Sequence, residues 1–165
     1  MAAADLIGAA VGVLLLVIVA YMLVGSTLST AEIVTNAQKA VTLQEQTQLR
    51  TDFTITGVTG VTPVTGGYMF NCTINNTGKE IISDFRHMDV VVYGDNDYQL
   101  CTYNPNKEEV IPGTWTILDK GTETIHLSEL DPGEAYQIMV TTSGISPYWF
   151  QINTGNGVYA SKLLY

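Results

Sequence analysis

The sequence predicts an α+β protein, in which one long N-terminal hydrophobic α-helix is followed by an immunoglobulin-like antiparallel β-sandwich. Nineteen consecutive uncharged residues, nearly all apolar, run from Leu6 to Val24. From Thr51 onward, apolar side chains recur at every second residue between short turn sequences. Helix and strand patterns do not alternate along the chain, which disfavours a doubly wound fold. We therefore expect two domains, residues 1–49 and residues 50–165.

The first domain is expected to be one helix from about residue 3 to about residue 48. The run from Leu6 to Val24 would measure ~28 Å as a helix, close to the hydrocarbon thickness of a bilayer. Beyond it, apolar residues continue at three- and four-residue spacings among Gln, Glu and Lys, and no proline occurs before Pro63. The whole helix would measure roughly 70 Å. The alternative is a membrane anchor followed by a flexible stalk.

The apolar run differs from a secretory signal peptide, which has a basic segment ahead of a shorter apolar core. The first basic residue here is Lys39, although Ser29-Thr30-Ala31 would pass as a cleavage site. A conventional membrane anchor also has Lys or Arg on its cytoplasmic side. We therefore expect a retained helix, and one explanation of the missing basic flank is that a short basic leader has been removed ahead of residue 1.

The second domain is expected to contain seven to nine short strands. Tyr68, Phe70, Cys72 and Ile74 alternate strictly with their neighbours, as in a half-buried strand. Turn sequences rich in Gly, Asn, Asp and Pro separate the other runs, in the pattern of an antiparallel sandwich. Besides these residues and a first strand near 53–58, the predicted strands are 88–93, 98–103, 114–118, 122–127, 135–142, 148–152 and 158–164.

Charge and motifs exclude several kinds of function. The 16 acidic and 7 basic residues give a net charge of −9, which would repel nucleic acid and anionic lipid headgroups. His87 and His126 are the only histidines, and HExxH, GxSxG, P-loop and dinucleotide-binding motifs are missing. We expect neither enzymatic activity nor a cofactor. Asp95 and Asp97 offer ligands for calcium, but an ordinary hairpin turn is the favoured interpretation.

Two pairs of residues in predicted strands are candidates for covalent modification. Asn71 and Asn75 begin the N-glycosylation sequons Asn-Cys-Thr and Asn-Asn-Thr, and their spacing within the alternating strand points both outward. Cys72 and Cys101 could bridge the two sheets, and closing that loop of ~30 residues would contribute ~3 kcal/mol. The alternative is two reduced thiols that pack as small hydrophobic side chains.

The layout resembles the archaeal type IV pilin-like superfamily, which includes archaeal pilins, archaellins and the archaellum F and G proteins. The resemblance covers nearly the whole chain, because the apolar run and its amphipathic extension to about Leu49 precede an archaellum-type sandwich. In the sandwich it is carried by short strings in a characteristic order. These are Arg50-Thr51-Asp52-Phe53-Thr54-Ile55, Ile74-Asn75-Asn76-Thr77-Gly78, Asp84-Phe85 before Asp89-Val90-Val91-Val92, and Asn153-Thr154-Gly155-Asn156-Gly157-Val158 before Ala160-Ser161.

In that superfamily a membrane-embedded peptidase removes a short basic leader, and the apolar helices then bundle into a filament core. The resemblance implies a structural subunit of an extracellular archaeal filament, archaellum or pilus, for motility or adhesion. Such a subunit is inserted in the membrane before it joins a homo-oligomeric filament, whose outer sandwiches carry any glycans. The alternative is a membrane-anchored adaptor that resembles the archaellum F and G proteins and binds the surface layer.

Assembly would bury the N-terminal helix against copies of itself. Small residues would allow close backbone approach, while large apolar side chains would exchange lipid for neighbouring helices. Asp5 stands beside the apolar run, where a carboxylate is costly unless it is paired or near the interface. Its partner would be the α-amino group of Met1 in a neighbouring copy, or the helix dipole alone would stabilise it. The other residues expected at this assembly surface are Leu6, Gly8, Gly12, Leu14, Leu15 and Val19.

Overall fold

The computed structural model describes residues 2–95, 97–123 and 125–164, with the backbone alone for residues 2–6. The chain divides into two compact units, Met1–Gln44 and Glu45–Tyr165. The division lies within the N-terminal helix, five residues before the boundary expected between residues 49 and 50. The last residues of the helix therefore pack with the β-domain that follows them.

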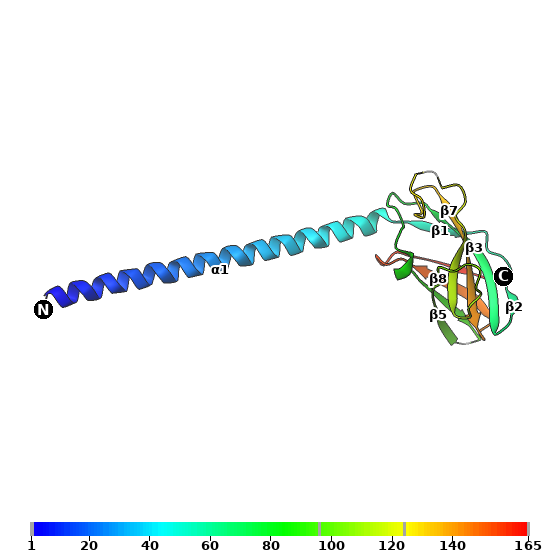
Figure 1. The fold of residues 1–165 in the computed structure, drawn as a ribbon, viewed down its shortest axis with the longest axis horizontal. Helices are drawn as coiled ribbons and strands as arrows, with labels where there is room; N and C mark the ends of the chain where they lie inside the picture. Colours follow the sequence, from blue (N-terminus) through cyan, green and yellow to red (C-terminus); the bar gives the residue numbers. More distant parts are fainter. Residues whose placement is uncertain (1, 96, 124, 165) are drawn as a thin grey trace. The chain divides into compact units, whose positions relative to one another are not determined.

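Helix α1 (Ala2–Arg50) is one uninterrupted α-helix (Figure 1). It confirms the helix expected over residues 3–48 and replaces the flexible stalk of the alternative. The small polar residues after Val24 do not interrupt it, and the hydroxyls of its threonines bond within the helix to carbonyls one turn earlier. The hydroxyl of Thr27 donates to the carbonyl of Leu23 over 2.6 Å, and that of Thr35 donates to Ala31 over 2.8 Å.

The second unit is a β-domain with one short 3-10 helix, η1 (Phe85–His87). Hydrogen bonds connect its strands in the order β1-β3-β7-β6-β5-β4-β8-β9, and β2 pairs with β3. The pairing is antiparallel except between β5 and β6, which run in parallel. The strands are β1 (Phe53–Thr56), β2 (Thr62–Val64), β3 (Gly67–Asn76), β4 (Asp89–Gly94), β5 (Asp97–Tyr103), β6 (Thr114–Asp119), β7 (Ala135–Ser143), β8 (Pro147–Asn153) and β9 (Tyr159–Leu163).

The strands enclose a single apolar core. Phe70 of β3 meets Phe150 of β8 with ring centroids 4.8 Å apart, and both side chains are buried. Trp115 of β6 is buried too, and its indole Nε1 donates to a backbone carbonyl over 3.2 Å. β1 and β9 are the first and last strands of this order, and they contact each other. Lys162 Nζ of β9 donates to the carbonyl of Ile55 in β1 over 3.1 Å. The expected sandwich is thus confirmed, and this contact gives it a barrel-like closure.

Three details of the strand prediction are wrong. The predicted strand 122–127 is a loop in its described residues, and its two apolar side chains, Ile125 and Leu127, are exposed. Strand β2 was not predicted from the sequence, because Pro63 lies in its centre and a proline normally argues against a strand. The parallel pairing of β5 with β6 departs from an all-antiparallel sheet, since the long connection between them returns the chain in the same direction.

Within the second unit, the end of α1 is fixed to the β-domain by polar contacts. Arg50 Nε lies 2.7 Å from Glu80 Oε1, and the amide of Lys79 donates to the Arg50 carbonyl over 2.7 Å. The hydroxyl of Thr51 accepts a hydrogen bond of 2.7 Å from the amide of Asn156. An arginine in the last turn also interacts favourably with the helix dipole. The bond from Lys79 satisfies a carbonyl that a helix end otherwise leaves without a partner, and the other contacts join side chains.

Candidate assembly surface on the N-terminal helix

The N-terminal half of α1 presents apolar side chains on every side. From Ile7 to Val24 the large side chains are exposed by 44% at Ile18 to 83% at Tyr21, so nothing in the described chain covers them. The sequence has no charged residue between Asp5 and Glu32. An amphipathic helix of a globular protein buries one stripe, whereas a helix that is apolar all round is surrounded by protein or lipid. This surface therefore requires an apolar environment from outside the chain.

The helix also has the length and composition of a membrane span. Its most apolar 18-residue window has a mean hydropathy of 2.8, in a described helical stretch of 44 residues, Ile7–Arg50. About 20 apolar residues suffice to cross the hydrocarbon core. Membrane insertion is thus compatible with the same residues that are available for assembly.

The predicted assembly residues lie on this apolar part of α1. Leu14, Leu15 and Val19 are more than half exposed, and at Gly8 and Gly12 an added Cβ would meet no atom within 4 Å. A neighbouring helix could therefore approach the glycines without obstruction from this chain. The side chains of Asp5 and Leu6 lie outside the described residues. A shallow apolar groove between helical turns is lined by Ala9, Ala10, Val13, Leu14 and Val17.

The apolar surface continues along the second half of the helix as a narrow stripe. Ile33, Val34 and Val41 are exposed and lie on one side of the helix by their spacing, while Glu32 and Lys39 lie on the other side.

The assembly residues predicted from the sequence are only part of the apolar surface, because the prediction named small residues and a few large ones. Val11, Val13, Leu16 and Val17 are exposed to a similar extent.

The two sequons lie on β3. The inward-facing side chains around them are buried, whereas Asn71 and Asn75 are half-buried, in agreement with the predicted alternation. Asn75 Nδ2 donates weakly, over 3.3 Å, to the hydroxyl of Thr56. Asn71 is more enclosed, because its Oδ1 is buried without a hydrogen-bond partner and its backbone carbonyl accepts from the amide of Thr59 over 2.9 Å. Asn75 is accordingly the more accessible of the two side chains.

Of the two alternatives for the cysteines, the structure has the free thiols and not the bridge. Cys72 and Cys101 are both fully buried. Burial raises the pKa of each thiol to about 12, because the thiolate would lose its hydration. A thiol with such a pKa is a poor nucleophile, so both residues contribute to packing.

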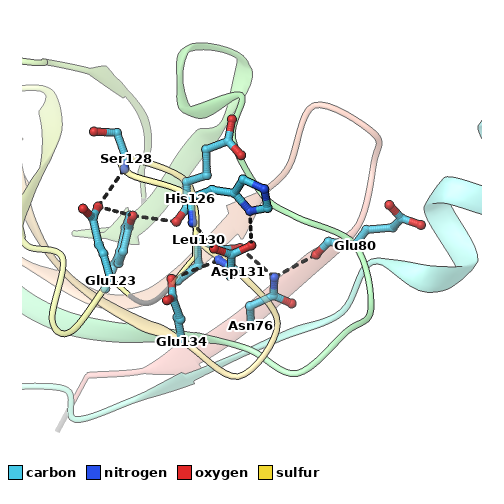
Figure 2. Close-up of polar contacts among 10 residues, drawn as sticks. Asn76, Glu80, Glu123, His126, Ser128, Leu130, Asp131 and Glu134 are labelled. Carbon is cyan, nitrogen blue, oxygen red and sulfur yellow. Dashed lines mark hydrogen bonds and ion pairs between the residues drawn. The ribbon is translucent and has the colours of Figure 1, made fainter.

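A polar network holds the loop between β6 and β7. The backbone amide and the ring Nδ1 of His126 each contact the buried carboxylate of Asp131, over 2.9 Å (Figure 2). Glu123 accepts hydrogen bonds of 2.8 Å from the amide of Ser128 and from the hydroxyl of Tyr136. The hydrogen bond with Asp131 raises the pKa of His126 and lowers that of the carboxyl. These contacts anchor the loop at His126 and at Ser128.

Asp95 and Asp97 hold the turn between β4 and β5 through hydrogen bonds to backbone amides. Asp95 Oδ2 accepts from the amide of Ser146 over 2.6 Å, and Asp97 Oδ1 accepts from the amide of Tyr98 over 2.8 Å. Asp95 has a positive φ of 48°, which Asp tolerates in tight turns. Among the described residues, no group of three or more His, Cys, Asp or Glu could hold a metal ion.

Comparison with known proteins identifies the family. Two solved structures from Sulfolobus acidocaldarius are similar to this chain at 21% sequence identity. The first is the archaellum periplasmic stator protein FlaG; the match covers 68% of this chain and 98% of that chain, with a TM-score of 0.48. The second is the archaellum periplasmic stator protein complex FlaF and FlaG; the match covers 67% of this chain and 86% of that chain, with a TM-score of 0.47. No curated protein matches the chain. The model of the archaeal-type flagellin family matches residues 3–160, which include both the apolar helix and nearly all of the β-domain. The chain therefore belongs to the archaeal-type flagellin family and is a structural protein of the archaellum.

Proposed function

We propose that this chain is a filament-forming subunit, which assembles with copies of itself through the apolar part of α1. The observation that carries the proposal is the exposed surface around the helix from Ile7 to Val24. A surface of this size needs lipid or protein around it. Membership of the flagellin family supports a structural, cell-surface role for the assembled protein. Before assembly, the same helix would be inserted in the membrane.

Packing, rather than escape from water, would drive the helix from lipid into the filament. Lipid tails are as apolar as leucine, so helix association in a membrane depends on close contacts between the helices. Gly8 and Gly12, with the open space around them, would allow backbones to approach. Each contact between carbon atoms contributes only ~0.1–0.2 kcal/mol, but a well-packed leucine makes tens of them. The groove at Ala10 and Val13 would accept such side chains.

The second half of the helix would extend the contact between copies. The stripe with Ile33 and Val41 supplies apolar side chains. The hydroxyls of Thr30, Thr35 and Thr42 already bond to carbonyls within the helix, at 2.8 to 2.9 Å. Burial of a polar group is costly mainly when it loses a hydrogen bond. These hydroxyls would therefore enter a helix bundle at little cost.

Substitution Leu14→Asp tests the proposal. An aspartate at the centre of an inserted helix costs ~2.5–3.5 kcal/mol, which the other apolar residues of this run should offset, so membrane insertion persists. In a filament every copy would bury an unpaired carboxylate. We expect the variant in membranes at near wild-type amounts and fibres reduced at least tenfold in the material sheared from cells, measured by pelleting and electron microscopy.

Two controls separate assembly from folding. Leu14→Met keeps the volume and apolar character of the side chain and should assemble normally. Leu49→Asp introduces the same charge at an exposed position near the other end of the helix and should change fibre yield little. Normal fibres from Leu14→Asp would exclude a filament core made of this helix.

The alternative is a membrane-anchored adaptor that binds the surface layer. The length and hydropathy of α1 favour it as well, since the helix is able to cross a bilayer by itself. The two functions differ in how the protein leaves the cell. A filament subunit would be released by shear and pelleted without detergent, whereas an adaptor would stay with the membrane and require detergent.

The outward side chains of β3 support N-glycosylation at Asn71 and Asn75. Asn75 is expected to carry the higher occupancy, because the Asn71 side chain is more enclosed. Mass spectrometry of peptides from native protein measures the occupancy of each sequon. Asn75→Gln should remove most of the glycan mass, and an unmodified Asn75 peptide would contradict the expectation.

A further inference from the structure

An aromatic row crosses the outer face of the strands β5, β4, β8 and β9. Tyr98, Tyr93, Trp149 and Leu163 are direct cross-strand neighbours in that order. The ring centroids of Tyr93 and Tyr98 are 4.3 Å apart, and Tyr148, at the bulge beside Trp149, approaches Tyr93 to 5.0 Å. Val92, beside Tyr93 in β4, and Phe150, beside Trp149 in β8, point inward and are fully buried. The row is therefore the outward face of the sheet.

The composition of this row is that of an interface. Tyr98 is 66% exposed, and Tyr148 and Leu163 are exposed as well, although the domain is otherwise acidic. Tyrosine and tryptophan are enriched at the centres of protein interfaces, since they combine a large apolar area with a polar tip. Isolated apolar residues on a surface are normal, but five adjacent ones on four strands form a contiguous patch.

The size of the aromatic row decides what covers it. A stable complex between free proteins needs about 20–30 residues on each side, and the row supplies five. Such a small contact becomes effective when the partners are already held together, because tethering raises the local concentration to the millimolar range. In a filament, neighbouring N-terminal helices, each ~10–12 Å in diameter with its side chains, would hold the β-domains side by side. The occupant that meets this condition is a second copy of the chain.

A second apolar surface is available on the loop between β6 and β7. Ile125 and Leu127 are 72% and 83% exposed. They flank His126, whose backbone amide and ring Nδ1 both contact the carboxylate of Asp131 (Figure 2). The residue between the two apolar side chains is therefore anchored to the domain. Preorganisation of this kind lowers the entropy lost on binding.

The aromatic row and this loop lie at opposite ends of the β-domain. Tyr98 stands at the start of β5, and β5 runs parallel to β6, with Tyr103 beside Trp115. From Tyr98 to Asp119, where β6 ends and leads into the loop, the path follows about nine residues of strand, or roughly 30 Å. Two different surfaces at opposite ends of one molecule form a heterologous contact, which repeats without closing.

We propose that the aromatic row of one copy packs against Ile125 and Leu127 of a neighbouring copy. This head-to-tail contact between β-domains rests on the proposed function, because only the filament holds the domains close enough. It supplies a second point of attachment outside the helical core. The contact leaves the row without access to solvent and gives the exposed loop a defined partner.

Cysteine crosslinking in assembled filaments tests the contact. Full-length Tyr98→Cys/Leu127→Cys protein is assembled, sheared from cells and treated with a short bismaleimide. We expect a ladder of crosslinked oligomers on denaturing gels. Crosslinks within one chain are excluded by the distance between the two positions, and the native Cys72 and Cys101 are too buried to react. Untreated and wild-type filaments should remain monomeric on the gel.

A matched control uses Tyr159→Cys/Leu127→Cys, because Tyr159 is also 66% exposed but lies at the other end of the same sheet face. A ladder from the Tyr98 pair and none from the Tyr159 pair supports the proposal. Equal ladders, or no ladder in filaments of normal appearance, overturn it, as does a crosslink from Tyr98→Cys to a surface-layer protein. Wild-type cells that shed no fibres would instead overturn the proposed function, and with it the contact; electron microscopy distinguishes this case.

Discussion

At the scale of single residues, His126 shows how one ion pair sets the pH dependence of a loop. Its pKa is raised by the hydrogen bond with Asp131, so its contribution to stability is complete below pH 6.5 and is lost as the pH rises through the higher value in the folded protein. The pKa of Asp131 is lowered, so its contribution is lost only in acid, below its usual 3.8. The pair is therefore strongest between about pH 4 and pH 6.5.

We expect His126→Gln to lower the melting temperature at pH 5.5 and to have a smaller effect at pH 9. As the pH rises through the raised pKa of His126 in the folded protein, the imidazole loses its charge and the ion pair no longer contributes to stability. Thermal unfolding of both proteins across this range gives the difference directly. A difference that stays constant from pH 5.5 to pH 9 would show that the charge on His126 contributes nothing.

The buried thiols give a second prediction at this scale. Because the pKa of both Cys72 and Cys101 is raised to about 12, a thiol reagent at pH 8 should label neither residue in the folded protein. In denaturant without reductant, it should label both. Labelling of the folded protein would contradict the burial, and two unreactive residues in denaturant would indicate a disulfide instead.

At the scale of elements, the regular patterns of the sequence predicted most of the fold. The uncharged run and the absence of proline predicted α1, and strict alternation predicted strands such as β3. The alternation of apolar residues wrongly predicted a strand at Ile125 and Leu127, because alternation reports periodicity and not burial. In this loop, backbone amides bond to acidic side chains and not to a neighbouring strand. The parallel pairing of β5 with β6 and the aromatic row depend on contacts between distant strands, which local patterns do not contain.

The glycines of α1 yield a prediction for the helix as an element. Gly12 has open space around it, so Gly12→Ala and Gly12→Leu should both leave the monomer intact and raise the helix propensity by ~0.5–1 kcal/mol. In a bundle, leucine would obstruct close approach while alanine would be tolerated. We expect Gly12→Leu to reduce fibre yield several-fold and Gly12→Ala to preserve it. Gly25→Leu, beyond the apolar run, is the matched control, and equal yields from the two leucine variants would contradict a role of Gly12 in close approach.

At the scale of the whole molecule, the net charge of −9 opposes assembly. From Thr51 onward the chain has 13 acidic and 5 basic residues, so neighbouring β-domains repel one another. The proposed contact also brings the acidic hairpin at Asp95 and Asp97 toward the acidic loop that contains Glu123. Screening lengths fall from ~30 Å at 0.01 M salt to ~8 Å at 0.15 M, which is shorter than a β-domain.

Filaments should therefore become more stable as sodium chloride is added. We expect the temperature at which sheared filaments dissociate, measured by light scattering, to rise between 0.01 M and 0.15 M and to change less above it, since most of the repulsion is then screened. Salt also strengthens apolar contacts, but that effect continues to grow at higher concentration. Replacing Asp95 and Asp97 by asparagine should reduce the salt dependence, whereas Glu108→Gln/Glu109→Gln, which removes the same charge from a different loop, should reduce it less. Equal effects of the two double variants would assign the salt dependence to net charge alone and not to the contact between β-domains.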